Sequence, residues 1–124
     1  MKLPGPDHPI SVMPVPGRVT VMAGDQVIVS TDRALRMKES TYLPVYYFPR
    51  EDAEMDLLEA TDHTTHCPYK GDASYFSIPA LGETGVNAVW SYETPFSAMA
   101  EIVGHLAFYS DCVTIKAEES LSGP

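Results

Sequence analysis

Short stretches in which apolar and polar residues alternate run through most of the chain, and this pattern predicts β-strands. Residues 18–23 and 26–30 alternate with the period of a strand, and the two residues between them, Gly24-Asp25, suit a tight hairpin turn. Further strands are predicted over residues 33–39, 43–48, 64–67, 73–78, 86–92 and 106–115, the last around a turn at Ser110-Asp111.

Two segments instead have helical features. Residues 49–54 resemble a single helical turn, because a proline at its first position is followed by acidic residues. A second helix would begin at Thr94-Pro95, a cap followed by a first-turn proline. Apolar residues then recur at the i, i+3, i+4 and i+7 spacing of a helix, which predicts one α-helix over about 95–104. These residues are Phe96, Met99, Ala100 and Val103.

The predicted fold class is therefore mainly β (β-rich α+β). A chain of 124 residues fits one domain with a single core. Residues 1–17 contain five prolines, which remove backbone donors and fix φ, so they predict an extended Pro-rich arm. Residues 18–116 form the predicted β domain, and the polar residues 117–124 a frayed tail.

Charge and composition narrow the classes of partner. The net charge is −9 and the eight Lys and Arg residues are scattered, which disfavours nucleic acid and anionic membrane surfaces as partners. No apolar run approaches the roughly 18 residues of a membrane span, and the first residues lack an apolar signal core. We therefore expect a cytoplasmic protein in which Cys67 and Cys112 are reduced thiols.

The stretch from His63 to Tyr75 gathers more titratable and hydrogen-bonding groups than any other. Cys67 is the most obvious nucleophile, but His66 beside it would point to the opposite face of a strand and is poorly placed to activate it. Lys70, across the turn, is better placed to favour the thiolate. Cys67 and His66 are thus the catalytic candidates, and the alternative is an inert cysteine that braces a turn.

Neither a metal site nor a glycine-rich phosphate-binding loop is supported. Two histidines and the two cysteines are capable ligands, but no Cys-x-x-Cys or His-x-x-x-His pair accompanies them, so we predict no metal and no cofactor. Lys70-Gly71 lacks the full glycine-rich pattern of a phosphate loop, and Gly71 more simply supplies the positive φ of a turn.

Two cations and several aromatic residues predict a small-molecule site instead. Arg50 and Lys70 each lie in an aromatic neighbourhood, and together they would hold a carboxylate or phosphate. The alternative is a salt bridge of each with Glu51, Asp52 or Asp72. Aromatic residues on strands more often belong to the core, yet tyrosine and tryptophan also line small-molecule pockets. The predicted ligand-binding residues are Arg50, Lys70, Tyr47, Tyr75, Trp90 and His66.

Four ordered motifs carry a resemblance to a known family. They are Pro49-Arg50-Glu51-Asp52, His63-Thr64-Thr65-His66-Cys67-Pro68-Tyr69-Lys70-Gly71 with Ala73-Ser74-Tyr75, Asn87-Ala88-Val89-Trp90-Ser91-Tyr92 and Leu106-Ala107-Phe108-Tyr109. From about Arg18 to Ile115 the chain resembles the bacterial domain of unknown function 427 (DUF427) family. The resemblance implies a β-tent-like fold, two antiparallel sheets that meet at an angle, similar to methionine-sulfoxide reductase B and the cereblon ligand-binding domain.

The resemblance leaves the function open. Its β-tent relatives usually hold zinc through paired Cys-x-x-Cys knuckles, which this chain lacks. The family is sometimes labelled nucleotidyltransferase-like, but no Gly-Ser followed by an Asp-x-Asp pair is present. We expect a cytoplasmic bacterial protein that binds an unidentified small molecule, anionic or polar-aromatic, in an Arg/Lys/aromatic cleft. The alternatives are an enzyme that uses Cys67 as a nucleophile or redox thiol, a nucleotidyltransferase-like activity, and a structural or interaction module.

Overall fold

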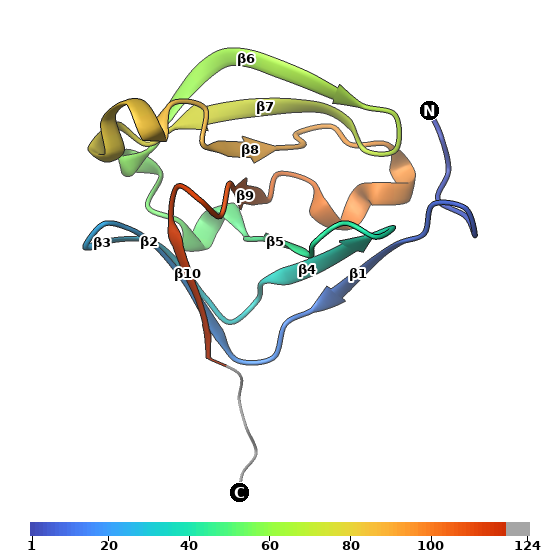
Figure 1. The fold of residues 1–124 in the computed structure, drawn as a ribbon, viewed down its shortest axis with the longest axis horizontal. Coiled ribbons are helices and arrows are strands. Elements are labelled where there is room, and N and C mark those ends of the chain that lie inside the picture. The colour runs from blue at the N-terminus through green and yellow to red at the C-terminus, as the bar shows by residue number, and fades with distance from the viewer. Residues whose placement is uncertain (119–124) are drawn as a thin grey trace, which may run out of the picture.

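A computed structural model describes residues 1–118, whose strands form three antiparallel sheets (Figure 1). The sheets have the strand orders β1-β4-β5, β10-β2-β3 and β6-β7-β8-β9. The mainly β class is confirmed, with three sheets where the family resemblance implied two. The strands are β1 (Ile10–Pro14), β2 (Arg18–Ala23), β3 (Gln26–Thr31), β4 (Leu35–Glu39), β5 (Val45–Tyr47), β6 (Glu59–Cys67), β7 (Gly71–Ser77), β8 (Val89–Ser91), β9 (Leu106–Phe108) and β10 (Thr114–Glu118).

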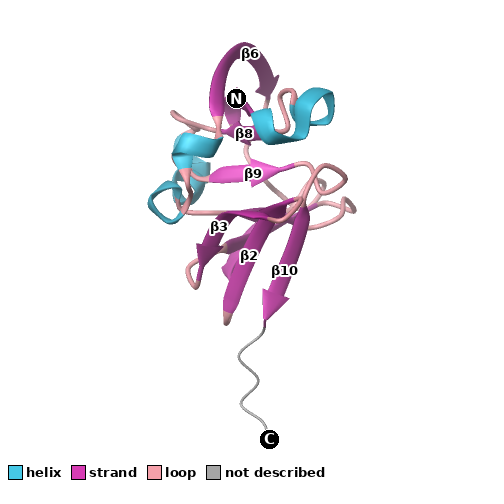
Figure 2. Ribbon diagram, turned by 90° about the vertical axis from the view of Figure 1, so that its left-hand side faces the viewer, coloured by secondary structure: helices cyan, strands magenta, loops and turns pink. Residues whose placement is uncertain are grey.

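The segment after β5 joins the three sheets. Phe48 and Leu106 exchange backbone hydrogen bonds of 2.8 Å, which link the end of β5 to β9 in the four-stranded sheet. A few residues on, Ala53 pairs with Val29 of β3. Figure 1 shows the result: the four-stranded sheet lies across the top, and the other two sheets diverge beneath it. In Figure 2, turned by 90°, β2, β3 and β10 lie below β9.

The two ends of the chain contribute strands. Part of the predicted arm, residues 10–14, forms β1, which pairs with β4 at the edge of its sheet, where proline is tolerated. Of the frayed tail predicted over residues 117–124, Ala117 and Glu118 end β10, and the rest lies outside the described residues. The predicted β2–β3 hairpin is confirmed, and Gly24 in its turn has a φ of 62°.

The predicted α-helix over about 95–104 is wrong. Within residues 1–118 every helical segment is a 3₁₀ turn: η1 (Arg50–Asp52), η2 (Met55–Leu57), η3 (Pro79–Gly85) and η4 (Ser97–Ile102). η4 breaks at Met99, and its buried residues, Met99 and Ile102, are three apart, which is the repeat of a 3₁₀ helix. Val103 is 51% exposed instead of core-facing. No helix among the described residues has the length and apolarity to cross a membrane.

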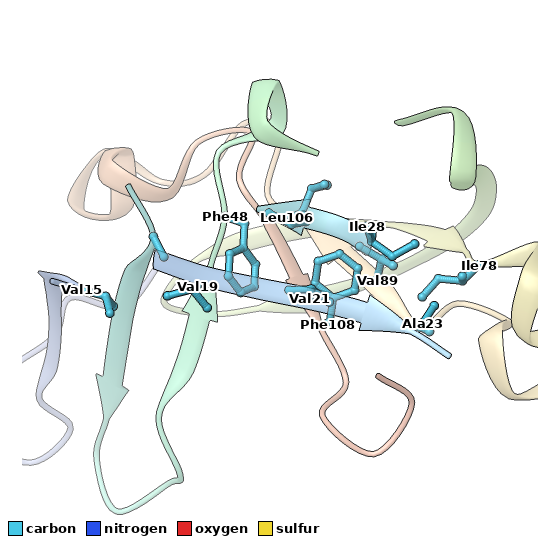
Figure 3. Packing of buried hydrophobic residues seen from close by; sticks show 13 residues of the cluster. Val15, Val19, Val21, Ala23, Ile28, Phe48, Ile78, Val89, Leu106 and Phe108 are labelled. Atoms are coloured by element: carbon cyan, nitrogen blue, oxygen red, sulfur yellow. The ribbon is translucent and has the colours of Figure 1, made fainter. Parts of the chain in front are cut away.

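Two clusters of buried side chains lie on opposite faces of the four-stranded sheet. The first cluster (Figure 3) includes Phe48, Val89 and Leu106. The second includes Tyr47 and Ala107. Neighbours in sequence enter different clusters because successive strand residues point to opposite faces. The second cluster holds most of the buried tyrosines, and the pocket described below opens from it.

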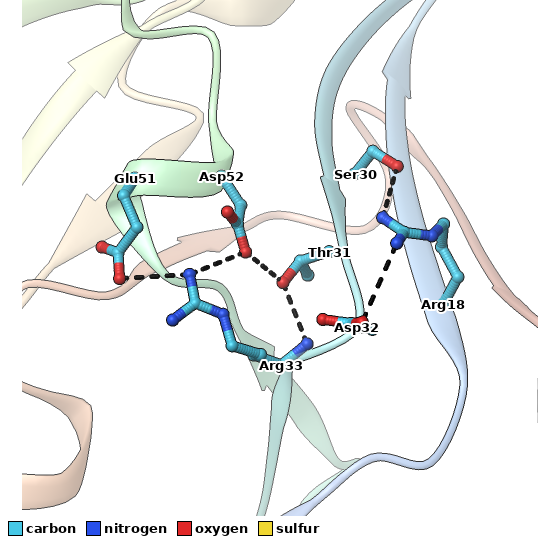
Figure 4. A network of polar contacts seen from close by, with 7 residues as sticks. All are labelled: Arg18, Ser30, Thr31, Asp32, Arg33, Glu51 and Asp52. Carbon is cyan, nitrogen blue, oxygen red and sulfur yellow. Dashed lines mark hydrogen bonds and ion pairs between the residues drawn. The ribbon is translucent and has the colours of Figure 1, made fainter.

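A polar network fixes the orientation of η1 (Figure 4). The Thr31 hydroxyl donates to Asp52 at 2.6 Å, and Arg33 donates to Asp52 and Glu51 at 3.1 and 3.2 Å. The hydrogen bond from Thr31 is the largest cause of a lowered pKa at Asp52. With Asp52 held against β3, Arg50 at the start of the same turn extends toward β8 instead.

Candidate functional site

An aromatic-walled pocket of about 240 Å³, here called the aromatic pocket, lies between the β1-β4-β5 sheet and the four-stranded sheet. β4 contributes Met37 and Glu39, which share one face of that strand because they are two residues apart. Tyr75 and Trp90 are direct partners on β7 and β8, so they form one wall together. Six of its eleven lining residues are aromatic: Tyr42, Tyr47, Tyr75, Trp90, Tyr92 and Tyr109.

Lys70 places a buried cation in this wall. Lys70 lies in the turn between β6 and β7, and the residue is 8% exposed. The ammonium group donates to Glu39 Oε1 at 2.6 Å and contacts Cys67 Sγ at 3.6 Å. Burial is the largest single influence and acts to lower the pKa of Lys70, but the hydrogen bond to Glu39 and the charge interactions around the ammonium together outweigh it, so the net shift is upward. Lys70 is therefore an ammonium ion at neutral pH.

Glu39 is shared between Lys70 and the N-terminal arm. Its second oxygen accepts a 2.8 Å hydrogen bond from His8, whose ring stacks on Tyr69 with 4.1 Å between centroids. The backbone N–H of Lys2 also donates to the Pro68 carbonyl. Burial is the largest single influence and acts to raise the pKa of Glu39, but the hydrogen bonds and charge interactions with Lys70 and His8 together outweigh it and lower that pKa. The N-terminal arm, through His8, thus positions the Glu39 carboxylate that pairs with Lys70.

Sequence reasoning did not find Glu39 or His8. Glu39 lies 31 residues from each of its two partners, so no local motif connects them. One signal was present: Glu39 continues the alternating phase of Leu35 and Met37, which placed a carboxylate on an otherwise apolar strand face. A charged residue on the core-facing side of a strand needs a buried partner for its charge.

Three tyrosines of the pocket have raised pKa values and act as neutral hydrogen-bonding groups. Burial raises the pKa of Tyr47 and of Tyr92, and it raises that of Tyr109 to about 12. The Tyr75 hydroxyl lies 2.9 Å from Thr65 Oγ1, and the rings of Trp90 and Tyr109 are 4.7 Å apart. At neutral pH Tyr47, Tyr92 and Tyr109 therefore offer flat apolar walls and uncharged hydroxyl groups, not general bases.

Arg50 lies on the other face of the four-stranded sheet. Its guanidinium donates to the Ser91 hydroxyl at 3.1 Å and to Glu93 at 2.6 Å, and it sits 5.4 Å from the ring centroid of Phe76. Ser91 follows Trp90 on β8, and consecutive strand residues point to opposite faces. Since Trp90 lines the aromatic pocket, Arg50 faces away from it.

The structure therefore does not bring Arg50 and Lys70 into one cleft, which corrects the arrangement expected from the sequence. Each cation has its own acid, Glu93 for Arg50 and Glu39 for Lys70. Neither acid was among those that proximity in sequence suggested, because both pairs join different strands or turns. Of the predicted ligand-binding residues, the structure gathers Lys70, Tyr47, Tyr75 and Trp90 around one pocket.

The catalytic candidates have different surroundings. His66 is exposed and its Nδ1 lies 2.7 Å from Asp72, outside the aromatic pocket. Cys67 is half-buried and packs against the second cluster. Its Sγ lies 3.6 Å from Lys70 Nζ, so the predicted proximity of Cys67 and Lys70 is confirmed. Cys67 and Cys112 are both free cysteines. Among residues 1–118 no group of three or more His, Cys, Asp or Glu side chains is placed to hold a metal ion.

Comparison with known proteins adds one finding. A family model described as a domain of unknown function (DUF427) matches residues 11–119. The match begins within β1 and extends past the end of β10, so it spans all three sheets and both walls of the aromatic pocket. No curated protein matches the chain.

Proposed function

Because the chain belongs to the DUF427 family, whose function is unknown, we propose a function from the pocket itself: the domain binds a small planar molecule that carries a hydrogen-bond acceptor. The observation that carries this proposal is a buried ammonium in a pocket with six aromatic lining residues. Aromatic walls favour flat ligands, and a few polar groups orient them. The proposed contact residues are Lys70, Tyr47, Tyr75 and Trp90, together with Glu39 and Tyr92, which line the same pocket.

Lys70 sets the polar chemistry of the ligand. An ammonium group has three N–H donors, of which one is directed to Glu39 and one to the Cys67 sulfur. The third is available to an acceptor in the pocket. Because Glu39 balances the charge of Lys70, a neutral carbonyl or amide suits the site as well as the carboxylate that an unpaired cation would favour.

The volume of the pocket limits the size of this planar group. A water molecule in the liquid occupies about 30 Å³. The 240 Å³ of the aromatic pocket therefore corresponds to about eight such volumes. A single substituted ring, such as that of benzamide or benzoate, matches this space. Cytoplasmic action stays part of the proposal, in keeping with two free thiols.

Trp90 is the one tryptophan in the sequence, so its fluorescence reports on the pocket wall. We expect benzamide and benzoate to change this fluorescence saturably and to raise the Tm. At ten times the Kd the stabilisation is about 1.4 kcal/mol. Benzylammonium should do neither, since Lys70 offers only donors. Equal binding of all three probes would contradict the proposed role of Lys70.

Substitutions test whether the changes in fluorescence and Tm arise from binding in the aromatic pocket. Lys70→Met should weaken benzamide binding by about tenfold or more, whereas Lys116→Met, an exposed lysine on β10, should leave it unchanged. Lys70→Met leaves Glu39 buried without its cation, so the double variant Lys70→Met/Glu39→Leu provides a second protein without the ammonium and without the orphaned charge. Unaltered benzamide binding in the double variant would refute the proposal.

A second candidate is an enzyme that uses Cys67, and the 3.6 Å contact with Lys70 favours it, since an adjacent ammonium stabilises a thiolate. The rate at which iodoacetamide alkylates Cys67 distinguishes the enzyme hypothesis from the binding function. The enzyme hypothesis requires Cys67 to react faster than N-acetylcysteine at pH 7, and Lys70→Met to abolish the difference. A slow reaction that Lys70→Met does not change leaves the binding function alone. The nucleotidyltransferase-like and interaction-module alternatives stay predictions.

A further inference from the structure

A second hollow adjoins the aromatic pocket. It has a volume of about 410 Å³, none of the residues among 1–118 that line it is charged, and we call it the apolar pocket. Four residues line both hollows: Leu43, Val45, Trp90 and Tyr109. The two hollows are therefore neighbours that share these residues as a common boundary.

The dividing residues present apolar surface to solvent. Leu43 is 86% exposed, although it lies at the rim of both hollows. Tyr109 is 44% exposed, and its ring leans on Trp90 at 49° between planes. Exposed apolar side chains that rim a pocket are a common mark of a binding surface. A ligand that crossed this rim would cover both Leu43 and the edge of the Trp90–Tyr109 pair.

The two hollows differ in the polarity of the residues that line them. The aromatic pocket contains the Lys70–Glu39 pair, whereas the apolar pocket is walled by Phe108, Ile115 and the four shared residues. We infer that the ligand is amphiphilic: its planar acceptor-bearing head occupies the aromatic pocket, and an apolar tail passes over Trp90 and Tyr109 into the apolar pocket. This inference rests on the proposed function, because it extends a ligand already seated at Lys70.

A homologous series of 4-alkylbenzamides, from methyl to hexyl, tests the tail directly. Each methylene that enters the apolar pocket should tighten binding about fourfold, because burying a CH₂ contributes about 0.8 kcal/mol. We expect the gain to continue over several carbons and then to level off as the chain leaves the hollow. The readouts are Trp90 fluorescence and Tm.

Two substitutions make the apolar pocket unsuitable for an alkyl tail while Lys70 is left unchanged. Ser110→Phe fills it from an exposed position, and Ile115→Asp places a charge in it. Both should leave benzamide affinity within about twofold and weaken 4-hexylbenzamide at least tenfold. Val27→Asp, an exposed apolar residue of β3 in the same sheet as Ile115, is the matched control and should change neither.

The outcomes separate the two proposals. If benzamide binds in a Lys70-dependent way but affinity does not rise along the series, the tail is refuted and the proposed function stands. If long chains bind equally well to wild type and to Ser110→Phe and Ile115→Asp, the tail lies elsewhere and the inference is overturned. If neither benzamide nor any alkylbenzamide binds, the proposed function fails and the inference fails with it.

Discussion

At the scale of single residues, Glu39 connects two distant parts of the chain at the site. It accepts hydrogen bonds from Lys70 and from His8, which come from the β6–β7 turn and from the arm. Each of these groups is largely shielded from solvent, so each depends on the others for its polar partners. Removing one member of such a group leaves buried charge without compensation, which costs more than the pair itself contributes.

Glu39→Gln should therefore lower stability at pH 7 by about 1–3 kcal/mol. The pKa of Glu39 is lowered in the folded protein, from an ordinary value of 4.5. A lowered folded pKa contributes stability above the unfolded value and loses it as the pH falls through the folded value. Wild type should thus lose more stability than Glu39→Gln between about pH 5 and pH 3, as measured by urea unfolding.

Glu101→Gln serves as the control for this pH dependence, because Glu101 is an exposed residue of η4. Its difference from wild type should be small at both pH values. A gap between wild type and Glu39→Gln that stays constant from pH 5 to pH 3 would show that the carboxylate of Glu39 does not depend on Lys70 and His8.

At the scale of elements, η4 shows how a helical pattern led to the wrong helix. The apolar positions of residues 95–104 satisfy a repeat near 3.6, but they also contain pairs three apart. The structure buries Met99 and Ile102 from this second set and leaves Val103 outside. Gly104, with a φ of 67°, then ends the segment. Periodicity over ten residues does not separate the two repeats.

Alanine substitution distinguishes the two repeats experimentally. Ile102→Ala should cost about 2–5 kcal/mol, because Ile102 is fully buried in the second cluster and its removal leaves a cavity. Val103→Ala should cost less than about 1 kcal/mol, because its side chain is half exposed. Urea unfolding of both variants measures this. Similar large losses at both positions would instead support the α-helical face that the sequence predicted.

At the scale of the whole molecule, the two core clusters are bound into one unit. β8 and β9 send alternate side chains into both, and Tyr47 and Phe48 do the same from the end of β5. The backbone bonds between Phe48 and Leu106 close this connection. Opening either cluster therefore disturbs strands that the other cluster needs.

We accordingly expect one cooperative unfolding transition. Trp90 belongs to the second cluster, whereas far-UV circular dichroism averages over all strands. The two signals should give the same midpoint in urea, as two-state unfolding requires. A fluorescence transition at clearly lower urea would contradict this expectation and would indicate that the pocket side of the sheet opens on its own.

Local patterns in the sequence were enough to predict several of the strands and the chemistry of the motif. Alternation of apolar and polar residues is a local property, so β2, β3 and their hairpin follow from it. The short turn after Cys67 likewise predicts that the Lys70 cation lies close to it. The beginning of β6 was not predictable in this way. Its exposed polar residues carry no alternation, and pairing with β7 defines them as a strand.

Which distant groups meet depends on tertiary packing. Arg50 and Lys70 have similar neighbours in sequence, yet strand alternation at Trp90 and Ser91 places them on opposite faces of one sheet. Glu39 and His8 joined the site through pairings across 31 residues, which no local pattern encodes. The physical reason is the same in each case: local sequence sets the side of a strand on which a residue lies, and the packing of sheets decides what lies opposite it.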